Sequence, residues 1–320
     1  MSVSLSFDKG KDNEAVAVVR GGQYDGEVLY LHKPDEKKVR AVPKKEFSPT
    51  KYAPQLKGIK SSDRVRLVAK IQEALDKNAE DLIGEPQNIK DLYQLIRRDI
   101  EKDKSIELPD GSIYQPIPSP DPKVRQIWYC AGASGSGKSY FAKNIAENYK
   151  KLFPDREVYL ISKLEEDDTL DNMKVNGKKD PPKRISLESL KKDYPTLEEF
   201  EDCLIIFDDY DTLQAPYDKI VQNLIDDLAI QGRHTNTSML VLSHYLTNYK
   251  KTRLILGEAH SLVLYPMATS FKALQYVCQT HCGLNKEEIQ GLKKLGRWVM
   301  IHKVYPQYLI AAQTAYLLNQ

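Results

Sequence analysis

A glycine-rich loop is the feature that most limits what this chain can fold into. Residues 132–139 read Gly-Ala-Ser-Gly-Ser-Gly-Lys-Ser, which matches the phosphate-binding pattern G-x-x-x-x-G-K-[ST] at every fixed position. Residues 126–131, just before the loop, are rich in strand formers, and residues 140–149, just after it, favour a helix. The loop is therefore expected where a strand turns into a helix, and this context predicts a nucleoside triphosphate site.

The expected roles of the loop residues follow from the geometry of such a turn. Glycines let the backbone N–H groups approach the phosphates, and the helix dipole adds partial positive charge at the same point. We expect Lys138 to contact the β- and γ-phosphates and Ser139 to ligate Mg²⁺, so that ATP and Mg²⁺ are the expected cofactors. The residues expected to bind the nucleotide are Gly132, Ala133, Ser134, Gly135, Ser136, Gly137, Lys138, Ser139 and Tyr140.

An acidic pair follows a second strand-like segment. Residues 204–207 form a short apolar run that ends in Asp208 and Asp209. A buried parallel strand delivers such carboxylates to the carboxyl edge of a sheet, so Asp208 is predicted to hold Mg²⁺ opposite Ser139. Asp209 is the candidate that polarises the attacking water. An isolated aspartate pair is more typical of a turn or a helix cap, but behind a phosphate-binding loop it favours nucleotide hydrolysis over nucleoside monophosphate kinase chemistry.

A third segment has polar residues at both ends of a buried-strand pattern. Residues 238–242 lead into Ser243 and His244, and a polar residue at the tip of a strand beside the phosphate loop is a candidate sensor of the γ-phosphate. Arg233 precedes the strand, and its planar guanidinium is suited to reach the γ-phosphate of a neighbouring subunit. Two alternatives stay open: Arg233 as a cation at a helix end, and His244 as an ordinary loop histidine.

These segments together carry a family resemblance. The series GASGSGKS, LIIFDD, GRHTNTSMLVLSH, SLVLYP, RWVMIHK and YLIAAQT resembles the genome-packaging ATPases of large DNA viruses, which belong to the FtsK–HerA superfamily of ring-forming DNA translocases. The resemblance runs from Val124 to the end of the chain. It implies that Lys138 and Ser139 bind ATP and Mg²⁺.

The resemblance extends to the catalytic residues, with two departures. Asp208 and Asp209 correspond to the acidic pair, although the second acid is more commonly glutamate in the family. The arginine associated with the fourth strand corresponds to Arg233. The polar residue at the strand end, which acts as the sensor, is often glutamine in the family, whereas this chain has His244 at that position. The expected catalytic residues are therefore Lys138, Asp209, Arg233 and His244.

The activity that the resemblance implies is ATP-driven translocation of double-stranded DNA by a homo-oligomeric ring that fills a viral capsid. DNA would be held through its phosphates without regard to sequence. The basic residues that are candidates for this contact are Lys174, Lys178, Lys179, Lys183, Arg184, Lys250, Lys251 and Arg253, and, nearer the N-terminus, Lys37, Lys38, Arg40, Lys44 and Lys45. Solvated surface charge is the alternative for any one of them.

Two other functions are compatible with the same motifs. A cellular or plasmid-borne helicase or DNA-transfer ATPase would share the core, but a helicase would separate the strands of a forked duplex. A nucleotide-gated assembly protein would hydrolyse ATP slowly and without response to DNA.

The alternation of expected strands and helices predicts a mostly parallel central sheet covered on both faces, and the resemblance implies that this sheet belongs to a RecA-like P-loop NTPase fold. Further strands are expected at 157–162, 261–265, 297–302 and 308–313. A helix that opens at Pro216 has a core-facing stripe of Ile220, Leu224 and Leu228.

The N-terminal part has a different pattern of expected elements from the P-loop part. We therefore divide the chain into an α+β domain (1–115), a proline-rich linker (116–123) and the P-loop domain (124–320). The first domain is expected to contain a hairpin with strands at 15–19 and 28–31, followed by two amphipathic helices at 63–77 and 88–101. The apolar face expected for the first helix consists of Val65, Val68, Ile71 and Leu75. Docking on a capsid or membrane-vertex protein is one role for this domain, and a lid on the ring is another.

Composition adds two limits. The chain has 320 residues, 41% of them hydrophobic, and a formal net charge of +2, so it is not a generically basic nucleic-acid binder. It has no run of about 18 apolar residues and no charged-then-apolar leader. We therefore expect no membrane insertion, and a location in the host-cell cytoplasm, at the site of viral assembly, or in the virion.

Overall fold

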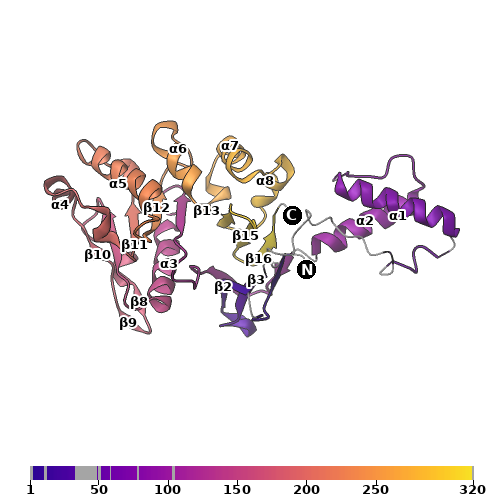
Figure 1. Cartoon of the computed structure of the whole chain (residues 1–320), viewed down its shortest axis with the longest axis horizontal. Helices are drawn as coiled ribbons and strands as arrows, with labels where there is room; N and C mark the ends of the chain where they lie inside the picture. The colour runs from indigo at the N-terminus through magenta and orange to yellow at the C-terminus, as the bar shows by residue number, and fades with distance from the viewer. Residues whose placement is uncertain are drawn as a thin grey trace.

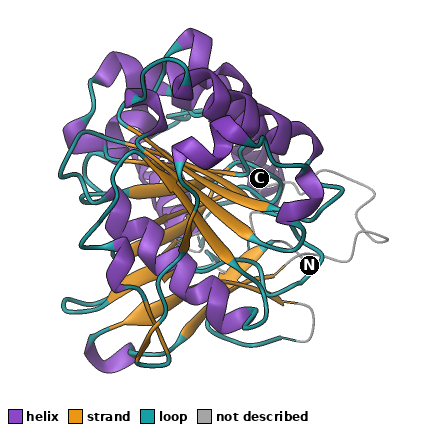
Figure 2. Ribbon diagram, turned by 90° about the vertical axis from the view of Figure 1, so that its left-hand side faces the viewer, coloured by secondary structure: helices purple, strands orange, loops and turns teal. Residues whose placement is uncertain are grey.

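The structure, a computed structural model, describes residues 3–10, 13–32, 49, 52–57, 59–77, 79–102 and 105–318. The basic stretch expected between Lys33 and Lys45 lies outside these residues. The described chain contains a large sheet with helices on both faces, a small four-stranded sheet, a separate two-stranded hairpin and a pair of helices that projects to one side (Figures 1 and 2).

Parallel strands form the centre of the large sheet. They are β6 (Ile127–Ala131), β7 (Val158–Ser162), β11 (Leu204–Asp208), β12 (Ser238–Ser243) and β13 (Ser261–Leu264). Across the sheet they follow the order β7-β11-β12-β6-β13. The strand that carries the acidic pair is therefore separated from the P-loop strand β6 by β12. This arrangement confirms the expected RecA-like P-loop NTPase fold.

Both edges of the large sheet carry additional strands. Short β10 (Lys183–Arg184) pairs in parallel with β7 at one edge. The other edge continues antiparallel from β13, so the sheet is mixed. These strands are β14 (Val299–His302), β15 (Tyr308–Ala311), β16 (Thr314–Leu317) and β4 (Ser105–Glu107). The strands expected at 297–302 and 308–313 are confirmed, and β16 and β4 are additions that the sequence did not predict.

Alternating strand residues build two hydrophobic layers, one on each face of the sheet. On one face, Tyr129, Phe207 and Val241 pack against the helices that follow the strands. Those helices are α4 (Leu187–Lys192), α5 (Tyr217–Gln231), α6 (Tyr249–Glu258), α7 (Phe271–Cys282) and α8 (Lys286–Leu292). The expected stripe of α5 is confirmed, since Leu224 and Leu228 are fully buried there. On the opposite face, strand residues pack against α3 (Lys138–Leu152) and the small sheet (Figure 1).

The small sheet contains the expected N-terminal hairpin. Its strands are β1 (Ser4–Ser6), β2 (Asn13–Arg20), β3 (Val28–His32) and β5 (Ile113–Pro116), in the order β1-β3-β2-β5. Val19 and Leu29 share a hydrophobic cluster with Met300 and Tyr308 of the large sheet. The division of the chain at 116–123 stays a prediction. Residues 105–107, however, form β4 and belong to the large sheet, because their backbone pairs with β16.

The projecting helices α1 (Ser61–Asp76) and α2 (Gln87–Lys102) have a hydrophobic cluster of their own. The expectation for Val65 is wrong: its side chain is 71% exposed, whereas Leu67 is buried. Leu67, Ile71 and Leu75 lie four residues apart and face α2, and two residues rotate a helix by about 200°, which turns Val65 away. Among the described residues, no helix is long and apolar enough to cross a membrane.

Candidate nucleotide site

The glycine-rich loop joins β6 to α3, as its sequence predicts. Strand β6 ends at Ala131 and α3 begins at Lys138. The loop starts against β12, because the Gly132 N–H donates to the carbonyl of Ser243 at 3.0 Å. Gly137, which precedes the helix, has φ 110°, a conformation that residues with a Cβ rarely adopt.

Close packing beneath the loop explains why Gly132 has no side chain. A Cβ on Gly132 would lie 2.6 Å from the Tyr265 ring and 2.7 Å from Ser136 Oγ. The Ser136 hydroxyl is itself buried, and it has no hydrogen-bond partner within the described chain. A buried hydroxyl without a hydrogen-bond partner inside a phosphate-binding loop fits a site that is completed by a polar ligand.

Two cations lie at the loop. The buried ammonium of Lys138 donates to the carbonyls of Gly132 at 2.9 Å and Ala133 at 3.4 Å. Arg297, just before β14, donates from Nε to the Ser136 carbonyl at 2.8 Å and from Nη2 to the Gly135 carbonyl at 2.6 Å. Sequence reasoning gave Arg297 no role, although it opens the RWVMIHK segment. The guanidinium therefore connects the start of the C-terminal strands to two carbonyls of the loop.

Asp208 lies at the end of β11 as predicted, and its side chain is buried. Burial, with smaller contributions from the nearby Asp209 and Asp167, raises the pKa of this carboxyl to about 6. Ser162 Oγ, at the end of β7, donates to Asp208 Oδ2 at 3.3 Å. A buried carboxylate among other acids is stabilised by a bound cation, which fits the expected role of Asp208 as a metal ligand.

The donor set suits Mg²⁺ held jointly with phosphate oxygens. In the described part of the chain, no group of three or more His, Cys, Asp or Glu side chains could hold a metal ion. Ser139 lies in the first turn of α3, and Asp208 ends β11. These two ligands would therefore need phosphate and water oxygens to complete the octahedral coordination of Mg²⁺, which is usual for this ion.

The structure brings Asp209 and His244 together. His244 follows β12, Asp209 follows the neighbouring β11, and His244 Nε2 lies 2.8 Å from Asp209 Oδ1. Asp209 has φ 50°, which turns its side chain out of the line of the strand. Both side chains are about one-quarter exposed, so the pair borders solvent at the carboxyl edge of the sheet.

Asp211 holds the end of β12 in place and was missed by sequence reasoning. Its Oδ2 accepts from Ser243 Oγ at 2.7 Å, from the His244 N–H at 2.8 Å and from the Tyr245 N–H at 3.2 Å. The Ser243 hydroxyl thus faces Asp211. Of the two expected sensor residues, His244 is the one whose side chain contacts the acidic pair.

Arg233 is not brought to the site of its own chain. It lies in the exposed turn between α5 and β12, at the amino edge of the sheet, whereas the loop lies at the carboxyl edge. The residues of β12 separate the two edges by roughly 20 Å at about 3.3 Å per residue. Tyr140 follows the loop on α3 and is 61% exposed.

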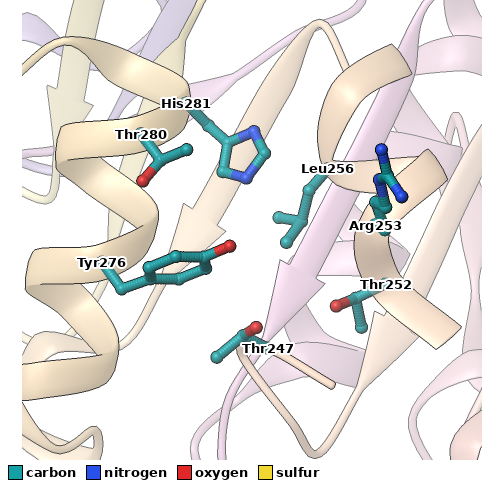
Figure 3. A pocket seen from close by; sticks show the side chains of 7 residues that line it. All are labelled: Thr247, Thr252, Arg253, Leu256, Tyr276, Thr280 and His281. Carbon is teal, nitrogen blue, oxygen red and sulfur yellow. The ribbon is translucent and has the colours of Figure 1, made fainter. Parts of the chain in front are cut away.

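A cavity of about 190 Å³ lies between α6 and α7 and includes none of the residues expected to bind nucleotide or metal or to act in catalysis, although Arg253, a candidate DNA contact, is part of its wall (Figure 3). Its lining residues are Thr247, Thr252, Arg253, Leu256, Tyr276, Thr280 and His281. Burial, and the charge of Lys303, lower the pKa of His281, so this ring is neutral near pH 7.

Comparison with known proteins finds a viral relative of this chain. No protein-family model matches it. It is 30% identical over 219 residues to uncharacterized protein V3 of Sputnik virophage, an alignment that covers 67% of this chain and 85% of the virophage protein.

Solved structures with a similar fold are more distant in sequence. The genome packaging NTPase B204 of Sulfolobus turreted icosahedral virus 2 is 13% identical, with a TM-score of 0.39 over 61% of this chain and 96% of that one. The pCW3 conjugation coupling protein TcpA is 12% identical, with a TM-score of 0.37 over 96% of this chain and 77% of that one.

The strand order and the strand-loop-helix unit establish that this is a P-loop NTPase fold, as the sequence resemblance implies. The extent and identity of the virophage alignment establish a closer kinship. The chain belongs to the same protein family as protein V3 of Sputnik virophage.

Proposed function

We propose that this protein is a Mg²⁺-dependent ATPase whose homo-oligomeric ring translocates double-stranded DNA, in the packaging of a viral genome into a capsid. One observation carries the proposal. The phosphate-binding loop, the buried Asp208 and the Asp209–His244 pair come from three neighbouring strands and meet at one edge of the sheet. The resemblance of the sequence to packaging ATPases supports the choice of DNA as the substrate that is moved.

The loop binds the triphosphate. Its backbone N–H groups and the start of α3 face the phosphates, and Lys138 exchanges its two carbonyl partners for phosphate oxygens. Ser139 and Asp208 would hold Mg²⁺, which would supply positive charge against the charge that develops on the phosphates.

Asp209 orients and polarises the attacking water. Its Oδ1 lies against His244 Nε2, and this contact gives the carboxylate a fixed position. His244 also lies at the strand end next to the loop, where it detects whether a γ-phosphate is present. Asp211 fixes the backbone at His244 and thereby the position of the imidazole.

Arg233 completes the site of the next subunit. It is at the edge of the sheet opposite its own loop, so it stabilises the transition state only across a subunit interface. This requirement makes hydrolysis depend on assembly of the ring. The N-terminal region, 1–115, then serves to dock the ring on a capsid or membrane-vertex protein, at the site of viral assembly in the host cytoplasm or in the virion.

The test is the steady-state rate of ATP hydrolysis at increasing protein concentration, with and without long duplex DNA, at several salt concentrations. We expect a rate per subunit that rises cooperatively with protein concentration, and stimulation by DNA that fades with salt. The variant Lys138→Ala is the control for contaminating ATPases. Hydrolysis that ignores both DNA and protein concentration would contradict the translocase and favour a nucleotide-gated assembly protein.

A further inference from the structure

A small basic hairpin projects from the P-loop domain beside α3 (Figure 1). We propose that this hairpin, residues 174–179, is the element that grips the phosphates of duplex DNA and that it moves with the nucleotide site. The inference rests on the proposed function, because it assigns the DNA contact of the same motor.

The hairpin has a compact and regular geometry. Strands β8 (Lys174–Val175) and β9 (Lys178–Lys179) pair antiparallel, with Lys174 opposite Lys179. The tip is Asn176–Gly177, with φ 51° and 79°, which is the pattern of a tight two-residue hairpin turn. A two-stranded ribbon of this kind is slender enough to lie against a DNA groove.

Charge distinguishes the hairpin from the other basic candidates in the same segment. Lys174, Lys178 and Lys179 are exposed, and residues 174–179 include no acid. Across the described chain, no ion pair involves the ammonium groups of these three lysines. They are therefore available to displace counterions from DNA phosphates.

The remaining two basic residues of the segment are already neutralised. Lys183 Nζ lies 2.9 Å from Glu157, and Arg184 makes a two-oxygen contact with Asp171 at 2.8 and 2.9 Å. A DNA contact by either would have to break its ion pair. These two pairs instead hold the base of the segment against the sheet.

The hairpin is connected to the nucleotide site through α3. The Lys174 N–H donates to Glu147 Oε1 at 2.7 Å, and Glu147 is part of α3. Beside this contact, Met173 is buried in the same hydrophobic cluster as Ile145 of that helix. Because α3 begins at Lys138, the attachment is roughly 14 Å along one rigid helix from the phosphate-binding loop.

A second connection runs through the metal-binding edge. The segment that carries the hairpin leaves β7 at Ser162, whose hydroxyl donates to Asp208 Oδ2. The segment returns through β10, which pairs with β7. A change at the loop would therefore reach the hairpin through α3, and a change at Asp208 would reach it through Ser162 and β7. Helices α4 to α8 lie on the opposite face of the sheet and, among the residues that the structure describes, have no such connection to the hairpin.

The partner is the phosphate backbone of duplex DNA. Lysine presents a point charge without the planar fork that reads base edges, so the hairpin is suited to hold DNA without regard to sequence. This is what a motor needs if it is to move along an arbitrary genome.

The experiment compares the full-length protein with the triple variant Lys174→Gln, Lys178→Gln, Lys179→Gln. A matched control removes the same charge from exposed lysines on the helical face, as Lys192→Gln, Lys219→Gln, Lys286→Gln. Binding to long duplex DNA is measured by fluorescence anisotropy against salt concentration, and ATP hydrolysis is measured with and without DNA.

We expect the hairpin variant to lower the slope of log affinity against log salt by about 2 to 3, since each phosphate contact contributes about 0.9. Its hydrolysis without DNA stays at the native rate, and its stimulation by DNA is lost. The control variant keeps the native slope. A hairpin variant with native slope and stimulation, or a control with an equal loss, would overturn the proposal.

A second pair of variants tests the connection to α3. Glu147→Ala removes the acceptor of the Lys174 N–H, and Glu147→Gln retains an acceptor oxygen. We expect Glu147→Ala to bind DNA with the native salt slope but to lose stimulation of hydrolysis, and Glu147→Gln to restore it. Native stimulation in Glu147→Ala would refute the coupling. If the native protein hydrolyses ATP but binds no DNA, the proposed function fails first, and the hairpin proposal fails with it.

Discussion

Asp208 is expected to destabilise the folded protein when no cation is bound, and the size of this effect can be worked out. Burial, together with Asp209 and Asp167, raises the pKa of the Asp208 carboxyl from 3.8 to about 6. At a pH above both values, the charged carboxylate is disfavoured in the folded state. Since each pKa unit corresponds to 1.36 kcal/mol, the penalty is about 3 kcal/mol. The isosteric variant Asp208→Asn should therefore increase the free energy of unfolding by about 3 kcal/mol near neutral pH.

The sign of the pH dependence follows from the same shift. The folded-state pKa is above the unfolded one, so the favourable contribution of protonated Asp208 is complete below 3.8 and is lost as the pH rises through about 6. The advantage of Asp208→Asn should fall to about half its full size near pH 5 and vanish at lower pH. Urea unfolding in a chelator, without nucleotide, measures this difference across the pH range.

The exposed Glu201 provides a matched control, because Glu201→Gln removes a carboxylate that is not buried. Its effect on the free energy of unfolding should stay within about 0.5 kcal/mol at every pH. If Asp208→Asn is no more stable than the native protein at neutral pH, or if its advantage does not depend on pH, the assignment of Asp208 as a strained metal-binding carboxylate is refuted. Binding of Mg²⁺ with ATP should weaken in the same variant, since the amide lacks the charge that holds the ion.

Further predictions concern the remaining site residues. Lys138→Ala should abolish nucleotide binding in a calorimetric titration, because the ammonium at the loop is removed, and unchanged affinity would exclude it from that role. Asp209→Asn should bind ATP as the native protein does but show no turnover in a coupled hydrolysis assay; residual native turnover would remove Asp209 from catalysis. Arg297→Ala should weaken nucleotide binding roughly tenfold, since two hydrogen bonds to the loop are lost, while Arg297→Lys should recover part of the affinity. Arg233→Ala subunits should be inactive alone but regain hydrolysis when mixed with Lys138→Ala subunits, because each supplies what the other lacks; a mixture without activity would argue against an arginine acting across the interface.

Local patterns were sufficient for much of the fold. Runs of apolar residues, and the polar or glycine residues that end them, predicted the strand before the loop, the helix after it and the strands β7, β11, β12 and β13. A buried parallel strand in such a fold is a short continuous apolar run, and this signal depends only on neighbours in the chain. The same logic failed at Val65, where an amphipathic pattern admitted more than one face.

Contacts distant in sequence explain what was missed. Nothing near residues 105–107 indicates that they complete the edge of the large sheet, because their partner is β16, some two hundred residues later. Asp211 and Arg297 are likewise recognisable only from what they touch: the end of β12 and the carbonyls of the loop.

The sequence by itself determined where the glycine-rich loop and the strand-end carboxylates form, because each is built from consecutive residues with fixed local geometry. The tertiary structure decided which of these residues meet. The order of strands placed β12 between β6 and β11, and so brought His244 to Asp209 and left Arg233 at the opposite edge. Strand order depends on how crossovers pack over the sheet, and no single segment encodes it.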